Sequence, residues 1–355
     1  MKILIIKPSS LGDIVHVFPA VDILLEAYPE AEIDWLVHPA FVGMVKYCRN
    51  FRRAIIFPRR ELGRAATFWP YLNRLARKLR RERYDLVVDF QGLLRSALFG
   101  RIARCRRYVG FGHPREAAAR FLYRENYEVP SEFVHAVDRN CYLAGRIVNR
   151  PYRPRLPLPL PVNPENSVRA EMRLRQAGIT PGTRFLGVIP GARWESKQWP
   201  PEFFAAVIDR LSGGDEHLRF VLLGSPADRA GAEAVLQAAA HPERLRSLVG
   251  ETRIGELVEI IRQSSGLLTN DSGPMHIAAA LQVPVFAVFG PTVPEKTGPY
   301  GNIHTVWQPE LSCCRCLKRQ CPTGAAPCHR AIDPEQAAET IMSKLSGEYR
   351  DEAKK

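Results

Sequence analysis

The sequence lacks any continuous apolar stretch long enough to cross a bilayer, which limits what its 355 residues can build. A membrane-spanning helix needs about 18 or more consecutive apolar residues, whereas the first apolar run, residues 3–6, ends at Lys7 and Pro8. That run is also shorter than the apolar core of a signal peptide, which takes about 7 to 15 residues. We therefore interpret the amino-terminal segment as the first strand of a cytosolic protein, a setting that argues against a disulfide framework for the eight cysteines.

Two common nucleotide-binding fingerprints are also missing. Neither the Gly-x-Gly-x-x-Gly pattern of dinucleotide-binding folds nor the Gly-x-x-x-x-Gly-Lys-Ser/Thr loop occurs in the chain. Hydride transfer and nucleoside triphosphate hydrolysis are correspondingly disfavoured.

The second half of the chain lacks any excess of positive charge, although the whole sequence carries a formal net charge of +13. Residues 161–355 contain 22 Lys+Arg and 22 Asp+Glu, whereas residues 1–160 contain 28 and 15. Such asymmetry predicts an anionic partner for the first half: nucleic acid, an acidic membrane surface, or a phosphorylated or carboxylated substrate. The chain lacks an aromatic stacking platform interleaved with the basic residues, so we expect no nucleic acid.

Short apolar runs alternate with helical stretches in both halves, a pattern typical of parallel sheets covered on both faces. Prolines at nearly every second position of 150–161 predict a stiff linker between the halves. We expect an α/β protein with two doubly wound, Rossmann-like domains, residues 1–155 and 156–332, and a ligand cleft between them. We expect a final helix within 333–355, and one alternative is that it crosses back to pack on the first domain. The strands and helices expected are 3–6, 17–27, 33–37, 54–57, 72–83, 86–89, 164–177, 185–189, 220–223, 266–269 and 334–345.

The most informative segment is 264–291, SSGLLTNDSGPMHIAAALQVPVFAVFGP. Its first apolar run predicts a strand that delivers Asp271, Ser272 and Gly273 into a turn, after which Pro274 opens a helix. A helix N-terminus beyond a strand's carboxyl end offers free N–H groups and partial positive charge to a phosphate. An ordinary capped helix is the alternative interpretation.

Three further loops are expected at the same sheet edge. Lys197 and Arg193 follow the strand 185–189, so their charges are placed to meet a diphosphate whose charge grows as it leaves. The alternative is that Lys197 and Arg193 are surface cations without a partner. His276 fits a structural role as well as it fits contact with the ligand. The remaining candidates for donor binding in these loops are Gly224, Gly290 and Pro291.

Asp13 comes just after the first strand, behind the tight turn that Gly12 permits. A single carboxylate at this edge of a sheet can act as a general base. An Asp at a helix start also serves well as an N-cap, and both interpretations remain open.

Five cysteines cluster in LSCCRCLKRQCPTGAAPCHR, residues 311–330. Cys313 and Cys316 form a C-x-x-C knuckle, and Cys321 and Cys328 supply two more thiolates for a tetrahedral site. The spacing predicts a structural zinc or iron, with free thiols in a loop as the alternative.

Together, these segments resemble the ADP-heptose:lipopolysaccharide heptosyltransferases, glycosyltransferase family 9, which have the GT-B fold. The resemblance spans most of the chain, and it implies inverting transfer of heptose from ADP-L-glycero-D-manno-heptose to Kdo of the lipopolysaccharide inner core. It implies no catalytic cofactor, a Kdo2-lipid A acceptor, and a peripheral location on the inner face of the cytoplasmic membrane. The motifs that carry it are KPSSLGDIVHVFPAV at 7–21, YDLVVDFQGLLRSAL at 84–98, HAVDRN at 135–140, SKQWPPEFF at 196–204 and NDSGPMHIAAAL at 270–281.

The resemblance also assigns roles to matching residues. Asp13 matches the proposed catalytic base and Lys197 the lysine that holds the sugar-nucleotide phosphates, whereas Ser272 stands where members often carry Thr. The donor loop that it implies consists of Asp271, Ser272, Gly273 and His276. The anionic groups of the acceptor are expected to meet Ser10, Arg59, Arg60, Arg64, Arg95, Arg120 and His135.

Within the family, the first half is most similar to heptosyltransferase I. The cysteine cluster instead resembles the tail of heptosyltransferase II and of metal-carrying protein heptosyltransferases. Heptosyltransferase II and a protein heptosyltransferase therefore stay open as alternative functions. A non-catalytic polyanion-binding protein is a more distant alternative.

Overall fold

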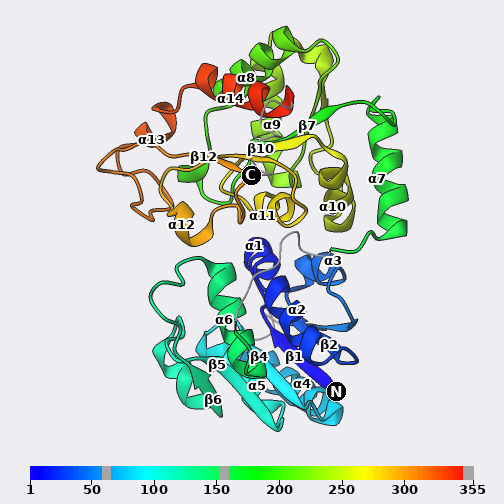
Figure 1. Ribbon diagram of the computed structural model, residues 1–355, viewed down its shortest axis with the longest axis vertical. Coiled ribbons are helices and arrows are strands. Elements are labelled where there is room, and N and C mark those ends of the chain that lie inside the picture. The colour runs from blue at the N-terminus through cyan, green and yellow to red at the C-terminus, as the bar shows by residue number, and fades with distance from the viewer. Residues whose placement is uncertain (58–64, 152–159, 347–355) are drawn as a thin grey trace. The chain divides into compact units, whose positions relative to one another are not determined.

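The computed structural model describes residues 1–57, 65–151 and 160–346. The chain divides into two compact units, Met1–Pro161 and Val162–Lys355 (Figure 1). The boundary expected after residue 155, and most of the predicted linker, lie outside the described residues.

Each unit contains a six-stranded parallel sheet, and the two sheets share one topology. The strand order is β3-β2-β1-β4-β5-β6 in unit 1 and β12-β11-β10-β7-β8-β9 in unit 2. In both, the chain starts in the middle, winds to one edge, and returns to build the other half, which confirms the predicted doubly wound α/β fold. The unit 1 strands are β1 (Lys2–Ile6), β2 (Glu32–Val37), β3 (Phe51–Ile56), β4 (Leu86–Asp89), β5 (Arg107–Phe111) and β6 (Glu125–Tyr127). The unit 2 strands are β7 (Phe185–Ile189), β8 (Arg219–Leu222), β9 (Leu245–Ser247), β10 (Gly266–Asn270), β11 (Val285–Val288) and β12 (Thr305–Trp307).

The central pairs β1–β4 and β7–β10 are the switch points of the two sheets, because the winding direction reverses there. Ligands of such folds bind beyond the carboxyl ends of the strands at these points. The registers Ile6↔Asp89 and Thr269↔Ile189 bring the loops after each pair together.

Helices and 3-10 turns connect the strands. Those of unit 1 are α1 (Leu11–Val15), α2 (Phe18–Ala27), η1 (Pro39–Phe41), α3 (Val42–Val45), α4 (Ala65–Glu82), α5 (Leu94–Ile102), η3 (Ala117–Leu122) and α6 (Ala136–Val148). Those of unit 2 are α7 (Pro164–Gln176), η4 (Glu195–Lys197), α8 (Pro201–Gly214), η5 (Pro226–Asp228), α9 (Arg229–Ala238), η6 (Pro242–Arg244), α10 (Ile254–Gln263), α11 (Gly273–Ala280), α12 (Pro294–Thr297), α13 (Pro327–Arg330) and α14 (Pro334–Ser346).

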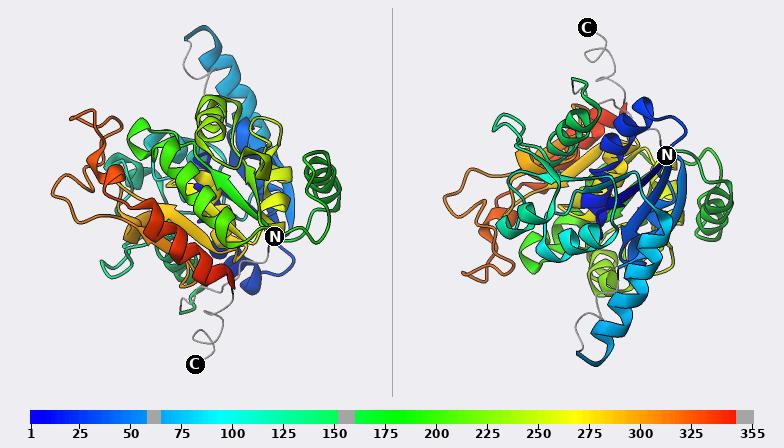
Figure 2. Two further views of the ribbon diagram at one scale, coloured as in Figure 1. Left: turned by 90° about the horizontal axis from the view of Figure 1, so that it is seen from above. Right: turned by 90° about the horizontal axis from the view of Figure 1, so that it is seen from below.

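Local sequence explains where several helices begin. Asn163 caps α7 by accepting a hydrogen bond from the Asn166 N–H, and Pro164 occupies the first helical position. In contrast, α4 begins well before the predicted start at residue 72, although Pro70 lies inside it and removes one N–H donor. Helix α14 packs along α8 within unit 2 (Figure 2), and its crossing back to unit 1 stays a prediction.

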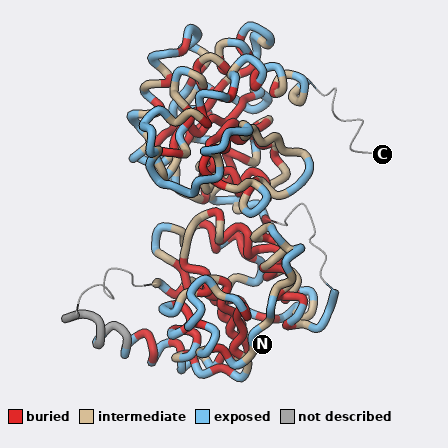
Figure 3. The backbone as a smooth tube through the Cα atoms, turned by 90° about the vertical axis from the view of Figure 1, so that its left-hand side faces the viewer, coloured by how far each residue is buried: buried red, intermediate tan, exposed pale blue. Residues whose placement is uncertain are grey.

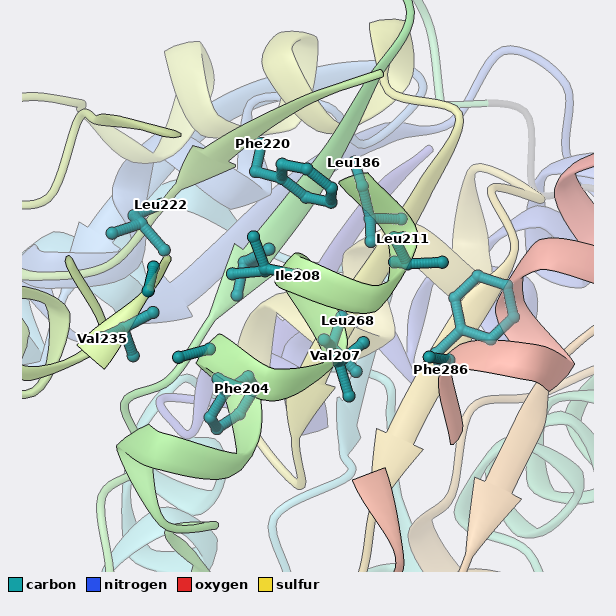
Figure 4. Close-up of a cluster of buried hydrophobic side chains, with 14 of the residues drawn as sticks. Leu186, Phe204, Val207, Ile208, Leu211, Phe220, Leu222, Val235, Leu268 and Phe286 are labelled. Carbon is teal, nitrogen blue, oxygen red and sulfur yellow. The ribbon is translucent and has the colours of Figure 1, made fainter. Parts of the chain in front are cut away.

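The core of unit 2 lies between its sheet and α8. Phe204, Ile208 and Leu211 of α8 pack against Leu186 and Phe220 of the sheet, and each is at most 1% exposed (Figure 4). The alternation of buried and exposed residues along α8 produces this apolar face.

In unit 1, α4, α5 and η3 cover one face of the sheet. Leu79 of α4 and Phe99 of α5 share a buried cluster with Leu4 and Val87 of the strands, and Figure 3 shows the strand layer as largely buried. Right-handed crossovers place α2 on the opposite face, because β1-to-β2 and β4-to-β5 run in opposite directions across the sheet. Helix α6 packs against α2 on that face.

Among the helices of the described residues, none has both the length and the apolar character needed to cross a membrane.

Candidate functional site

The switch point of unit 2 presents a strand, a turn and a helix, as the sequence predicts. β10 ends at Asn270, and α11 begins at Gly273 with Ser272 as its N-cap residue. The Ser272 side chain does not cap the helix, because its hydroxyl lies 3.0 Å from the Thr269 hydroxyl instead. The first N–H groups of α11 are therefore left without a side-chain cap, as an anion-binding helix start requires. The alternative interpretation, an ordinary helix capped by the side chain of its N-cap residue, is therefore wrong for α11.

Lys197 is held at this turn by Asp271, whose carboxylate is also bonded by Thr292 from a separate loop. Its Nζ lies 2.5 Å from Asp271 Oδ2, and the Thr292 hydroxyl donates a 2.6 Å hydrogen bond to the same oxygen. The ammonium also lies 4.7 Å from the ring centroid of Trp194, within cation–π range. Only 7% of the Asp271 side chain and 16% of the Lys197 side chain are exposed, so this cation is positioned and poorly hydrated. Thr292 and Trp194 were not among the predicted site residues.

Asn270 ties the loop after β7 to the turn after β10. Its Oδ1 accepts a hydrogen bond from the Trp199 N–H at 3.0 Å, and its Nδ2 donates to the Pro190 carbonyl at 2.7 Å. A buried amide with both ends bonded fixes the loop that carries Lys197 relative to α11.

The backbone carbonyl groups of Gly290 and Pro291 are bonded by the cysteine-rich segment, residues 311–330. The Gly290 carbonyl accepts hydrogen bonds from the Arg315 N–H and from Gln308 Nε2, and the Pro291 carbonyl accepts one from the Leu317 N–H. Glycine is needed here for close packing, a reason that the sequence pattern did not reveal.

Replacing Gly290 by Ala should destabilise unit 2 by about 1 to 3 kcal/mol. A Cβ at this position would lie 2.7 Å from Cys328 Sγ and 2.8 Å from His329 Nε2, both of buried residues. Gly213→Ala in α8 is the matched control, because nothing lies within 4 Å of its added Cβ, and there Ala should stabilise by roughly 0.5 to 1 kcal/mol. Denaturant unfolding measures both, and an unchanged Gly290→Ala midpoint contradicts the packing role.

The other predicted donor-binding residues of unit 2 differ in their exposure and in their contacts. Arg193 is exposed, and His276 of α11 is only 7% exposed. Gly224 follows β8, and its carbonyl accepts a hydrogen bond from the Gly250 N–H. The structure thus brings the Lys197 ammonium and the Asp271 carboxylate into contact beside Ser272, the N-cap residue of α11.

Asp13 lies at the carboxyl end of β1 in unit 1, at the third position of α1. Its Oδ2 accepts hydrogen bonds from the Ser10 N–H at 2.9 Å and the Ser10 hydroxyl at 2.6 Å. Ser10 is the N-cap residue, so the interpretation of Asp13 as the N-cap is wrong, and Asp13 instead closes a capping box. Lys7, a buried residue, places its Nζ 3.6 Å from Asp13 Oδ1 and donates to the Phe90 carbonyl. The Asp13 side chain remains 44% exposed.

The acceptor candidates of unit 1 have varied surroundings. Arg95 and Arg120 are exposed, and the Arg120 guanidinium lies 4.8 Å from the Phe121 ring centroid. His135 caps α6 by accepting a hydrogen bond from the Val137 N–H at Nδ1, a structural role that the sequence did not indicate. Arg59, Arg60 and Arg64 lie outside the described residues.

Sequence reasoning missed Asp89, a fully buried carboxylate at the end of β4. It accepts hydrogen bonds from the Gln91 and Gly92 N–H groups and from the hydroxyls of Ser96 and Tyr123. Burial raises the pKa of Asp89, and these hydrogen bonds oppose that rise. Asp89 thereby shapes the turn that leads to Arg95. An acidic residue ending an otherwise apolar run was the available signal.

The predicted metal ligands lie near one another but are not gathered into a site. Burial raises the pKa of the Cys328 thiol to about 11. The neighbouring thiols of Cys314, Cys313 and Cys321 raise this pKa as well. Cys313 and Cys316 are exposed. Over residues 1–57, 65–151 and 160–346, no three His, Cys, Asp or Glu side chains are arranged to hold a metal ion.

Comparison with known proteins gives consistent matches. Residues 72–326 match the family model described as glycosyltransferase family 9 (heptosyltransferase). Lipopolysaccharide heptosyltransferase 1 of Pseudomonas aeruginosa is 31% identical over 331 residues, which cover 90% of this chain and 87% of that protein. Lipooligosaccharide heptosyltransferase 2 of Haemophilus influenzae is 29% identical over 319 residues, or 86% and 88% of the two chains. The solved structure of Escherichia coli ADP-heptose lps heptosyltransferase II is 26% identical, with a TM-score of 0.80 over 98% of this chain and 99% of that one.

Proposed function

The chain belongs to glycosyltransferase family 9, the heptosyltransferases, and from that membership we propose the following reaction. The enzyme transfers heptose from ADP-L-glycero-D-manno-heptose to Kdo of Kdo2-lipid A, with inversion at the anomeric carbon. The name of the E. coli relative supports the ADP-heptose donor, and the names of the relatives support a lipopolysaccharide acceptor.

The observation that carries the donor assignment is the position of Lys197. Asp271, which also accepts a hydrogen bond from Thr292, holds its ammonium at the turn from which the uncapped N-terminus of α11 begins. A diphosphate gains negative charge at its bridging oxygen as the bond to the sugar breaks. A fixed cation and aligned N–H groups stabilise that charge more strongly in the transition state than in the ground state.

Asp13 serves as general base in this proposal. The acceptor hydroxyl oxygen attacks the anomeric carbon, its proton passes to the Asp13 carboxylate, and the bonding pair of the broken C–O bond leaves with ADP. The two hydrogen bonds from Ser10 orient the carboxylate, and its exposure lets a sugar hydroxyl approach. No catalytic cofactor enters these steps.

We place this reaction at the inner face of the cytoplasmic membrane, because the acceptor is a glycolipid that is anchored there. The basic excess of residues 1–160 suits the carboxylates of Kdo and the phosphates of lipid A. Heptosyltransferase II and a protein heptosyltransferase remain the alternatives for the acceptor.

One assay tests the function directly. The purified chain is incubated with ADP-heptose and, in separate reactions, Kdo2-lipid A, the singly heptosylated lipid, or a peptide substrate. We expect ADP release together with a mass gain of one heptose on Kdo2-lipid A alone. Transfer only to the heptosylated lipid or the peptide selects the corresponding alternative. Absence of ADP release with every acceptor, together with salt-sensitive retention of RNA, indicates the polyanion-binding alternative.

The structural zinc or iron proposed for Cys313, Cys316, Cys321 and Cys328 is tested by elemental analysis. Four thiols are a suitable donor set, and metal binding is commonly coupled to local folding. We expect about one metal per chain, lost in Cys316→Ser and kept in the control Cys48→Ala, whose thiol is buried in unit 1. A metal-free protein that is stable and active dismisses the site.

A further inference from the structure

The layer of unit 1 formed by α4, α5 and η3 presents one continuous outward side. α4 contacts α5, and α5 contacts η3; Arg80 Nε also donates to the Ile102 carbonyl across the first of these pairs. The inward sides of α4 and α5 pack on the sheet through Leu75, Leu79 and Phe99. We call the outward side of these three elements the outer face.

On α4, the outer face is strongly basic. Arg74, Arg77, Lys78 and Arg81 recur at helical spacing on the side opposite the buried leucines, and all four are exposed. Together with Glu82 they line a hollow of about 390 Å³. Glu82 is already paired with Arg52 and Arg53. Within the part of the chain that the structure describes, none of the four cations has a carboxylate partner, so their charge is available to an anion.

On α5 and η3, the outer face is apolar. Leu94 and Leu98, four residues apart on α5, are 46% and 39% exposed, and Phe121 of η3 is 76% exposed. The Arg120 guanidinium stacks on the Phe121 ring, and Arg101 is exposed on the same side of α5 as the two leucines. Large apolar side chains gathered at the surface and bordered by arginines mark an interaction site.

We propose that the outer face docks on the surface of a bilayer that contains anionic phospholipid. The cations of α4 meet the headgroup phosphates, and Leu94, Leu98 and Phe121 enter the boundary between headgroups and acyl chains. Basic residues beside exposed leucine and phenylalanine are the composition of membrane-surface elements. A nucleic acid is a poorer match, because exposed aliphatic side chains gain nothing from a polyanion. Among the described side chains of this face, Phe121 is the one exposed ring, which is no stacking platform. This inference deepens the proposed function, since a lipid acceptor requires approach to a membrane.

Vesicle sedimentation of the full chain tests the docking. We expect binding to vesicles of phosphatidylcholine mixed with phosphatidylglycerol, weak binding to pure phosphatidylcholine, and weakening by salt. A variant with Arg74, Arg77, Lys78 and Arg81 all changed to Gln should lose on the order of several hundredfold in partitioning, since each of the four charges contributes roughly a fivefold factor. Leu94→Ser/Leu98→Ser/Phe121→Ser should lose the binding that remains at high salt.

Helix α7 of unit 2 offers a matched control. It exposes Val168 and Met172 by 58% and 55%, and its Arg169 and Arg175 are paired with glutamates. The variants Val168→Ser/Met172→Ser and Arg169→Gln/Arg175→Gln should keep wild-type vesicle binding. Circular dichroism checks that all variants are folded. Docking is overturned if the wild type does not bind anionic vesicles, or if the outer-face variants bind them as well as the wild type does. It is also overturned if the α7 variants lose as much vesicle binding as the outer-face variants.

Activity separates this inference from the proposed function. With detergent-dispersed Kdo2-lipid A, the outer-face variants should transfer heptose at the wild-type rate, whereas transfer to vesicle-embedded acceptor should slow. Vesicle binding that depends on the outer face, without transfer to any acceptor, leaves docking standing and removes the function. Transfer that is equally fast on vesicles for every variant removes docking alone.

Discussion

Replacing Asp13 by Asn should lower kcat by about a hundredfold to ten-thousandfold, the usual range for loss of a general base. The amide cannot take the proton of the acceptor hydroxyl. Its oxygen can still accept the two hydrogen bonds from Ser10 that close the capping box. Stability and ADP affinity should therefore stay near the wild-type values, which steady-state kinetics, thermal unfolding and calorimetric titration with ADP measure.

Asp13→Ala separates the two roles of this residue. It should abolish turnover and also lose the capping interactions, which are typically worth about 0.5 to 2 kcal/mol at a helix start. Glu256→Gln is the matched control, because Glu256 closes the capping box of α10 by accepting from the Arg253 N–H, and it should remain active. An Asp13→Asn enzyme with near-normal kcat would show that Asp13 only shapes α1, as would an inactive Asp13→Ala variant that no longer binds ADP.

Replacing Lys197 by Ala should cost about 2 to 4 kcal/mol of transition-state stabilisation, seen as a fall in kcat/KM, and should weaken ADP binding. The Lys197 ammonium lies 2.5 Å from Asp271 Oδ2, at the turn before α11. Its removal also leaves the largely buried Asp271 carboxylate with the Thr292 hydroxyl alone, so some loss of stability is expected too.

A double-mutant cycle isolates the catalytic part of this effect. Asp271→Asn keeps Lys197 while removing its ionic partner, and the double variant restores a neutral pair. If Lys197 acts on the donor phosphates, the double variant regains stability without regaining kcat/KM. Lys296→Ala, an exposed lysine of α12, is the control expected to behave as wild type. Normal kinetics for Lys197→Ala would remove this residue from the site.

The central strands were predictable because they are buried on both sides. β4 and β7 match their predicted ranges, and β1 and β10 differ by one residue at an end, since strands covered on both faces read as continuous apolar runs. The strands β5, β6, β9 and β12 were missed. The edge strands β6, β9 and β12 have only three residues each, and β12 is half-buried throughout, so none of these three leaves a clear apolar run.

The missed α5 shows a second limit of sequence patterns. Its leucines at 94 and 98 face outward while Ser96 and Gly100 are buried, so the usual apolar stripe is absent.

The places of the candidate residues in the fold were easier to predict than their contact partners. Asp13, Lys197 and Asp271 follow predicted strand ends, and motif position was enough to single them out. The contact of Lys197 with Asp271, 74 residues apart, depends on the pairing of β7 with β10 and on the bonds of Asn270, which spacing does not encode. The network around Asp89 likewise includes a long-range partner, the Tyr123 hydroxyl 34 residues away.

The most direct test of the donor site is a crystal structure of the chain with a non-transferable ADP-heptose analogue. We predict that the diphosphate lies at the N-terminus of α11, with Lys197 Nζ and the Gly273 N–H within hydrogen-bonding distance of its oxygens. A nucleotide bound at another edge of the sheet, with Lys197 still paired only to Asp271, would contradict the account.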